Sequence, residues 1–186
     1  MVTDGLKELA PSIASIRAAV LYVRYSPKKL AKFKEVAENE QIISSALLSL
    51  DVATRWNSTY LMLEAAVKYQ KAFNALEDDL HYQNYFEESI DGAPTESDWE
   101  NAKAFEGFLR SFYELTLQFS GSLYLTSNRY LIDIVQAKEY LSKLSKSDDR
   151  VVCGMAQNMK AKYDKYWGRP EKMNRLLFVA VILDPR

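Results

Sequence analysis

The sequence predicts a mostly α-helical domain, and three observations support this prediction. Glycine and proline, the residues that most often end helices, number only 6 and 5 among 186 residues. Apolar residues recur at three- and four-residue steps through most of the chain, which is the spacing of a helix face. Hydrophobic residues make up 48% and charged residues 26% of the chain, which is typical of a globular domain with its own core.

The first half of the sequence divides into three expected helices and one expected strand. An apolar stripe predicts a helix over residues 4–24, and a second helix should begin at Pro27 with Ser26 as its cap. The apolar run "ALLSLDV", residues 46–52, is less periodic and is interpreted as a short buried strand, so one or two strands are allowed. A helix over residues 58–80 follows, and then a loop that contains Gly92 and Pro94.

The second half predicts four further helices. Ser97 followed by Glu100 forms a capping-box pattern, and the helix that it opens should end at Gly121. The stretch 126–149 predicts another helix, and Asp148 or Ser147 should cap the next one, which Gly168 stops. The last helix should run from Pro170 to Pro185. Its end, "LLFVAVI", is apolar all round, so we expect it to be buried on every side.

The charge and residue counts exclude several classes of function. The net charge is -1, so the chain as a whole has no basic excess for nucleic-acid binding, and any DNA contact needs a local patch. One cysteine, Cys153, and one histidine, His81, cannot form a disulfide framework or a Cys/His metal site. No apolar stretch of about 18 residues predicts a membrane span. The N-terminal residues lack the apolar core of a secretory signal, so we expect a reducing nuclear or cytoplasmic compartment.

Arg55 and Trp56, in the stretch "DVATRWNSTYLML", allow two interpretations. A guanidinium can bind a phosphate with two hydrogen bonds, and an indole can stack on an unpaired base, so the pair could contact DNA. The more ordinary interpretation is a packed tryptophan and a surface arginine at a helix start, with Asn57 or Ser58 as the cap. From residue types alone, the second interpretation is favoured.

Asp51 and Asp184 are the other candidates, because each carboxylate lies beside an apolar stretch, as in two-metal nucleases. Such chemistry needs several carboxylates around ions about 4 Å apart, and nothing in the spacing brings these two together. The lysines at positions 28, 29, 32 and 34 could meet phosphates, but such a run is more often the solvated face of a helix. No pattern in the sequence predicts a cofactor or a small-molecule substrate.

Several blocks of the sequence resemble hAT-superfamily transposases. "LDVATRWNSTYLMLEAAVKYQKAF" is similar to the segment of this family that is built around Thr-Arg-Trp-Asn-Ser-Thr. The blocks "DGLKELAPSIASIRAAVLYVRYSPKKLAKFKE", "WENAKAFEGFLRSFYELTLQFSGSLYLTSN", "MAQNMKAKYDKYWG" and "LLFVAVILDPR" resemble plant BED-zinc-finger proteins of the RICESLEEPER type. The blocks follow one another in the family's order over nearly the whole chain.

The resemblance implies a ribonuclease-H-like catalytic core that is interrupted by a large helical insertion. Residues 1–53 would be a remnant of the core, and residues 54–186 would be the insertion. The family's three metal-binding acids lie upstream and downstream of the matched region. The BED zinc finger and the C-terminal dimerisation block are likewise expected to be missing. We therefore expect a catalytically incomplete, nuclear fragment without a cofactor.

The resemblance also favours a DNA role for the opening stretch. The family's matching tryptophan lies near the active site and is linked to handling of the DNA end, so Arg55, Trp56 and Asn57 become the candidate DNA contacts. The alternative is a helical module without DNA or enzyme activity, which self-associates or binds a protein partner through exposed apolar surface. A free-standing enzyme built on Asp51 and Asp184 is the third hypothesis. No membrane partner is expected.

Overall fold

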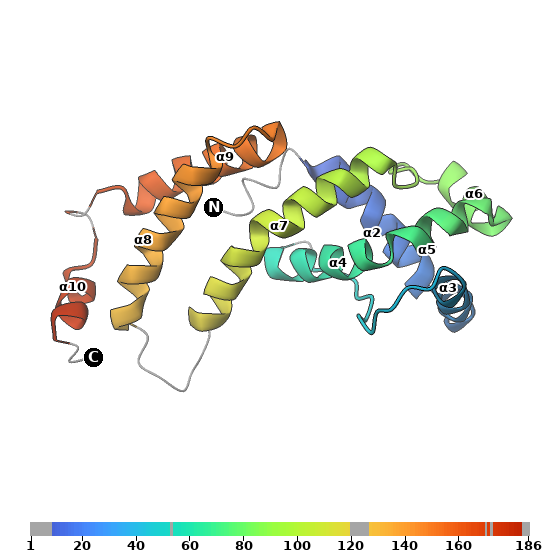
Figure 1. The fold of residues 1–186 in the computed structure, drawn as a ribbon, viewed down its shortest axis with the longest axis horizontal. Helices are drawn as coiled ribbons and strands as arrows, with labels where there is room; N and C mark the ends of the chain where they lie inside the picture. The colour runs from blue at the N-terminus through green and yellow to red at the C-terminus, as the bar shows by residue number, and fades with distance from the viewer. Residues whose placement is uncertain (1–8, 53, 120–126, 170, 172, 184–186) are drawn as a thin grey trace. The chain divides into compact units, whose positions relative to one another are not determined.

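A computed structural model describes residues 9–52, 54–119, 127–169, 171 and 173–183, and all regular elements within these ranges are helices (Figure 1). The predicted fold class, mostly α, is confirmed. The chain divides into two compact units, one of residues 9–107 and one of residues 108–186 together with residues 1–8. Residues on both sides of the boundary that we expected between residues 53 and 54 belong to the first of these units, and the boundary itself stays a prediction.

The unit of residues 9–107 consists of short helices around an aromatic and aliphatic core. Helix α2 packs against α3 and α4, and α3 packs against α5. The helices are α2 (Ala10–Arg24), α3 (Pro27–Asn39), α4 (Trp56–Lys68), α5 (Gln70–Ala75), the 3₁₀ helix η2 (Leu76–Asp78), α6 (Leu80–Glu87) and the first part of α7 (Glu96–Phe119). The side chains that are almost completely buried include Ile16, Val20, Leu63, Phe73, Trp99 and Phe105.

The helix start predicted at Ser26 is confirmed. The Oγ of Ser26 accepts a hydrogen bond from the backbone N–H of Lys29 at 3.3 Å, and Pro27 is the first residue of α3. This bond satisfies one of the four N–H groups that a helix start leaves without a partner inside the helix. For the preceding helix, the described part begins at Ala10.

The strand expected at residues 46–52 does not form. Residues 46–52 have no helix, turn or strand assignment, and the described ranges contain no second strand that could pair with them. Leu48 is buried, but Leu47 is 74% exposed. The hydroxyl of Tyr69 donates to the carbonyl oxygens of Ser44 and Ala46 at 2.9 and 3.0 Å. The apolar run is therefore held against the helices by side-chain contacts rather than by the backbone hydrogen bonds of a β-sheet.

The single helix expected over residues 58–80 is interrupted, and part of the expected loop is helical. The chain forms α4, α5 and η2 in succession, and α6 begins after Asp79, whose carboxylate accepts bonds from two backbone N–H groups of α6. Tyr82 of α6 is buried with its ring 5.1 Å from that of Tyr22. This aromatic packing explains why "DDLHYQNYFEESI" does not remain a loop. Gly92 has φ +67°, as a turn glycine does.

The cap of α7 lies two residues before the predicted one. Helix α7 begins at Glu96, and Thr95 and Asp98 bond reciprocally: the Thr95 N–H donates to the Asp98 carboxylate at 2.8 Å, and the Asp98 N–H donates to Thr95 Oγ1 at 3.3 Å. This is the geometry of a capping box with aspartate in the place of glutamate. The expected cap at Ser97 is therefore wrong, because Ser97 is already inside the helix.

The unit that contains residues 108–186 is built from the end of α7, α8 (Ser127–Leu144), α9 (Arg150–Trp167) and α10 (Arg175–Ile182). Helix α8 packs against both α9 and α10. Asp149 caps α9 in place of the expected Asp148 or Ser147, and Gly168 follows its last residue as predicted. Gly121, Pro170 and Pro185 lie outside the described residues.

The expectation that the last helix is buried on every side is wrong. Asn174 caps α10 through a bond from the Leu176 N–H, so the described helix begins after residue 170. Leu176, Ile182 and Leu183 are 71%, 78% and 74% exposed. A helix that is apolar all round thus leaves large aliphatic side chains in contact with water in this structure.

Candidate nucleic-acid interface

Arg55 is the residue that precedes α4, and its side chain is exposed. Its backbone is extended, with φ -119° and ψ 95°, and no side chain caps the start of the helix. The caps expected at Asn57 or Ser58 are not formed, because both residues are inside the first turn of α4. Arginine itself cannot accept a bond from the helix N–H groups. The start of α4 therefore presents a cation beside a helix N-terminus, where anions are favoured.

Trp56 and Asn57 occupy the first two positions of α4, and both side chains are half-buried. The Oδ1 atom of Asn57 is buried and has no hydrogen-bond partner within the described part of the chain. A buried acceptor without a donor costs free energy, so this amide oxygen does not stabilise the helix start. Arg55, Trp56 and Asn57 thus occupy the N-cap position and the first two positions of α4.

Ser58 closes the turn that leads into α4. Its Oγ accepts from the Val52 N–H at 2.8 Å and lies 3.0 Å from the Val52 carbonyl oxygen and 2.7 Å from that of Arg55. The Arg55 N–H donates to the Val52 carbonyl oxygen at 2.7 Å. The hydroxyl thus connects both ends of the turn, which restricts the backbone that carries Arg55.

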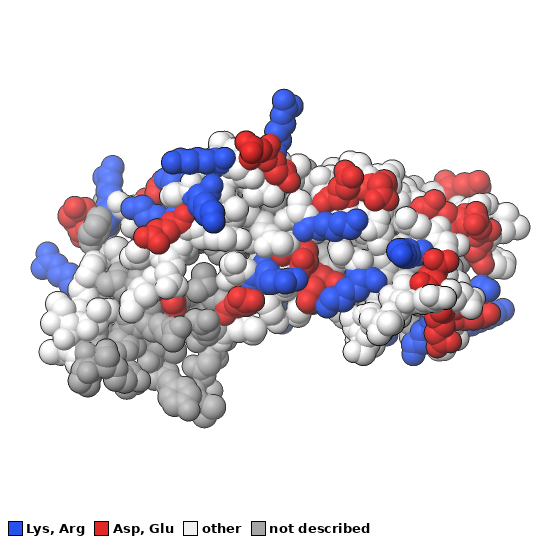
Figure 2. Space-filling view, viewed as in Figure 1, with Lys and Arg blue, Asp and Glu red and all other residues white. Residues whose placement is uncertain are grey.

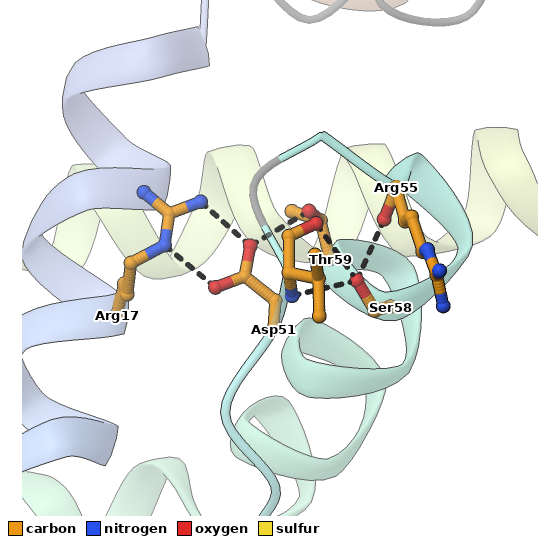
Figure 3. Close-up of polar contacts among 6 residues, drawn as sticks. Arg17, Asp51, Arg55, Ser58 and Thr59 are labelled. Carbon is orange, nitrogen blue, oxygen red and sulfur yellow. Dashed lines mark hydrogen bonds and ion pairs between the residues drawn. The ribbon is translucent and has the colours of Figure 1, made fainter.

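Asp51 fixes the other side of the same turn (Figure 3). Arg17 of α2 donates to it through Nε and Nη2, each at 2.7 Å, and the Thr59 hydroxyl of α4 donates to Oδ2 at 2.7 Å. The side chain of Asp51 is only 2% exposed, whereas that of Arg17 is 34% exposed. Two parallel bonds of this kind give a well-defined geometry as well as charge neutralisation. In Figure 3, Arg55 lies on the far side of this cluster from Arg17.

The protonation of Asp51 is set by competing effects. Burial raises its pKa, but the hydrogen bonds from Arg17 and Thr59 and the charge of Arg17 outweigh burial, so the pKa lies below the usual 3.8. The hydrogen bond to Asp51 raises the pKa of Arg17. Both groups are therefore charged at neutral pH. Since Arg17 is held by Asp51, Arg55 is the arginine of this cluster that is left for another anion.

The geometry does not favour Asp51 as a metal ligand. Both carboxylate oxygens already accept short bonds from Arg17 and Thr59. Within the described ranges, no group of three or more His, Cys, Asp or Glu side chains could hold a metal ion. Asp184 lies outside the described residues. His81 is exposed, and Cys153 donates to the Ser145 carbonyl oxygen at 3.2 Å.

Charges of both signs alternate on the face drawn in Figure 2, and no extended field of one sign is visible there. Of the lysine run on α3, Lys28, Lys32 and Lys34 are exposed, as expected for a solvated face. Lys29 instead places its Nζ 3.7 Å from the centre of the Tyr22 ring, a cation–π contact. On this face, therefore, no extended basic surface is available for a DNA backbone.

The roles of Arg17 and Thr59 were missed in the sequence. Arg17 lies 34 residues from Asp51, inside an apolar stripe that only predicted a helix. Thr59 belongs to the quoted stretch, but its spacing from Asp51 gives no indication that the two side chains meet. Only the packing of α2 against α4 reveals the cluster.

Comparison with known proteins identifies the family. Residues 1–108, more than half of the chain, match the family described as ZBED1 RNase-like helical domain. Residues 128–186 match the family described as hAT-like transposase, RNase-H fold. The chain belongs to the hAT transposase-like family. The first match includes residue 53, and the assignment of residues 1–53 to a catalytic-core remnant stays a prediction.

Three plant proteins illustrate the similarity to hAT relatives. The chain is 33% identical over 183 residues to zinc finger BED domain-containing protein RICESLEEPER 2 of Oryza sativa subsp. japonica, a match that covers 98% of this chain and 24% of that protein. It is 34% identical to the Zea mays protein named "Putative AC transposase", with 98% and 22% covered. It is 31% identical to DAYSLEEPER of Arabidopsis thaliana, with 83% and 21% covered.

The chain spans about a quarter of the length of these hAT relatives. No solved structure matches it. In the part that matches the RNase-H fold, the described elements are helices α8, α9 and α10. None of the described helices is both long and apolar enough to cross a bilayer.

Proposed function

We propose that this hAT segment contributes a DNA-contacting surface at the start of α4, in the nucleus, and that it does not itself supply catalysis. Arg55 would bind a backbone phosphate, Trp56 would stack on an unpaired base, and Asn57 would accept a bond from a base or sugar. The relatives are about four times longer than this chain. The proposal therefore concerns a DNA contact made by this segment, and not the activity of a whole protein.

The observation that carries the proposal is the exposed Arg55 at a helix start that no side chain caps. A phosphate there would meet a guanidinium and the positive end of the α4 dipole together. With a net charge of -1, the binding should be weak and depend on few phosphate contacts.

The experiment is a fluorescence-anisotropy titration of the 186-residue chain with a labelled DNA duplex that ends in a single-stranded overhang. Arg55→Ala should weaken binding by about 5- to 20-fold, as expected for one charge-assisted contact, and should reduce the salt slope by about one. Arg24→Ala is the matched control, because Arg24 is an exposed arginine of the same unit. Equal affinities for the Arg55→Ala variant and the unchanged chain would refute the DNA contact.

The proposed lack of catalysis is tested separately. Asp51 is bound by Arg17 and Thr59 on both oxygens, so we expect no metal-dependent nicking of a supercoiled plasmid that depends on it. Nicking in Mg²⁺ that survives purification and disappears in Asp51→Ala would show that the chain is an enzyme after all.

A protein-interaction module is the second candidate, and α10 is the observation that favours it. Leu176, Val179, Ile182 and Leu183 are exposed on or directly after one short helix. Exposed aliphatic clusters of this kind mark contact sites in many proteins. Self-association that Ile182→Lys abolishes and Ile90→Lys does not, measured by analytical ultracentrifugation, would favour this module. Ile90 is the control because it is also an exposed isoleucine, but in the other unit.

A further inference from the structure

We propose that Asp51 and Thr59 are positioning residues for Arg55, an inference that rests on the DNA contact proposed above. Neither side chain would touch DNA. Together they would hold Asp51 and Val52 against the start of α4, so that the guanidinium of Arg55 and the indole of Trp56 face the same ligand.

The connections of the turn support this role. Asp51, at its start, bonds to Arg17 of α2 and to Thr59 of α4, so the turn is tied to two helices at once. Ser58, the neighbour of Thr59, binds the backbone of Val52 through both its donor and its acceptor. Asp51 and Val52 are therefore both bound to side chains in the first turn of α4, which Arg55 precedes.

Burial explains why the cluster can act as a rigid support. The side chain of Asp51 is 2% exposed and Thr59 is 3% exposed, so water does not compete for their bond. Arg55, by contrast, is exposed and has no bond to this cluster through its side chain. When the backbone that carries an exposed cation is already rigid, less conformational entropy is lost on binding.

The same cluster also determines which arginine is available. Arg17 is 34% exposed and could reach an anion, but its guanidinium donates twice to Asp51. Asp51 therefore neutralises one arginine and orients the segment that carries the other. Thr59 is the better residue to alter in a test, because its replacement changes no charge.

Thr59→Val is the informative variant, since valine keeps the volume and removes only the hydroxyl that Asp51 accepts from. We expect DNA affinity to fall about 3- to 10-fold, the effect of one lost buried hydrogen bond on the geometry of the turn. The slope of affinity against salt should stay unchanged, because no phosphate contact is lost. Thr59→Ser retains a hydroxyl and should restore the affinity.

Ser12→Ala is the matched control for stability alone. Ser12 is a buried hydroxyl of the same unit, and it accepts a bond from Asn101 at 3.0 Å, outside the cluster at Asp51. It should lower stability in a similar way and leave DNA affinity unchanged. Hydrogen exchange adds a readout without DNA: the N–H groups of Val52 and Arg55 should exchange faster in Thr59→Val and at the normal rate in Ser12→Ala.

The outcomes separate the two proposals. If Arg55→Ala weakens binding but Thr59→Val does not, the DNA contact stands and the positioning role is wrong. If Thr59→Val and Ser12→Ala weaken binding equally, Thr59 is merely structural and the positioning role is also wrong. If Arg55→Ala has no effect, the DNA contact fails and the positioning role fails with it. Unchanged exchange at Val52 and Arg55 in Thr59→Val would refute the support of the turn directly.

Discussion

At the residue scale, the ion pair of Arg17 and Asp51 should contribute measurably to stability. Asp51→Asn removes the charge and leaves Arg17 without its carboxylate, which should lower the free energy of unfolding by about 1–3 kcal/mol. The partial exposure of Arg17 keeps the loss below that of a fully buried pair, because water can solvate the freed guanidinium. Urea unfolding at neutral pH measures the change. Asp78→Asn is the control, because Asp78 is exposed, and it should change stability little.

The same pair predicts a dependence on pH. The folded pKa of Asp51 is below the usual 3.8, so its stabilising contribution is complete above that value and is lost as the pH falls through the folded pKa. Asp51→Asn cannot titrate there. Its difference in stability from the unchanged chain should therefore be constant well above 3.8 and shrink as the pH falls below that value. A difference that stays constant below that value as well would show that the carboxylate is not selectively stabilised by folding.

Single residues also show what the sequence could predict about the candidate site. The sequence pattern placed Arg55 and Trp56 next to a helix start because apolar periodicity acts within a few positions, but the caps that it predicted at Asn57 or Ser58 are not formed. The pairing of Arg17 with Asp51 depends on how α2 and α4 pack, and no local rule joins residues so far apart in the chain. The exposed or buried state of each candidate was likewise decided by tertiary structure.

At the scale of the element, two mutations at the start of α7 distinguish the predicted cap from the observed one. Thr95→Ala should lower the free energy of unfolding by about 1 kcal/mol, because it removes the hydroxyl that accepts the Asp98 N–H. Ser97→Ala should be nearly neutral, since Ser97 is an exposed position inside the helix. Thermal unfolding of both variants decides between them. A larger loss for Ser97→Ala would place the cap where the sequence pattern put it.

The same helix contains Gly107, at the end of the compact unit of residues 9–107. A Cβ added at Gly107 would meet nothing within 4 Å, and glycine inside a helix is less favourable than alanine. Gly107→Ala should therefore raise the free energy of unfolding by about 0.5–1 kcal/mol. Gly168→Ala offers a contrast, because its Cβ would lie 2.4 Å from the Asp164 carbonyl oxygen, and it should destabilise. Destabilisation by Gly107→Ala would show that the helix needs flexibility there.

Elements were predicted well where one local cause dominates and poorly where packing decides. Ser26 and Gly168 delimit α3 and α9 as expected, because caps act within one turn. The strand at residues 46–52 and the buried last helix were wrong for the same reason. An apolar run indicates that a segment tends to be buried. Whether it forms a strand, a buried irregular segment or an exposed helix depends on the element that packs against it.

At the scale of the whole molecule, the two compact units should respond separately to a core mutation. Leu63 is completely buried in the unit of residues 9–107, and Leu63→Ala should destabilise that unit by about 2–5 kcal/mol. The three tryptophans allow each unit to be followed alone. Trp167→Phe leaves Trp56 and Trp99 as probes of the first unit, and Trp56→Phe combined with Trp99→Phe leaves Trp167 as the probe of the second.

Leu63→Ala in the Trp167→Phe background should shift the urea midpoint of fluorescence to lower concentration, because those probes lie in the unit that loses its core side chain. In the Trp56→Phe, Trp99→Phe background, the same mutation should leave the midpoint of Trp167 nearly unchanged, since cooperativity is strongest within one core. Equal shifts for both probes would mean that α7, which belongs to both units, couples them into one folding transition. Separate shifts would mean that the loss of the Leu63 side chain destabilises only the unit of residues 9–107, so that this unit, which carries Arg55, unfolds independently of the other.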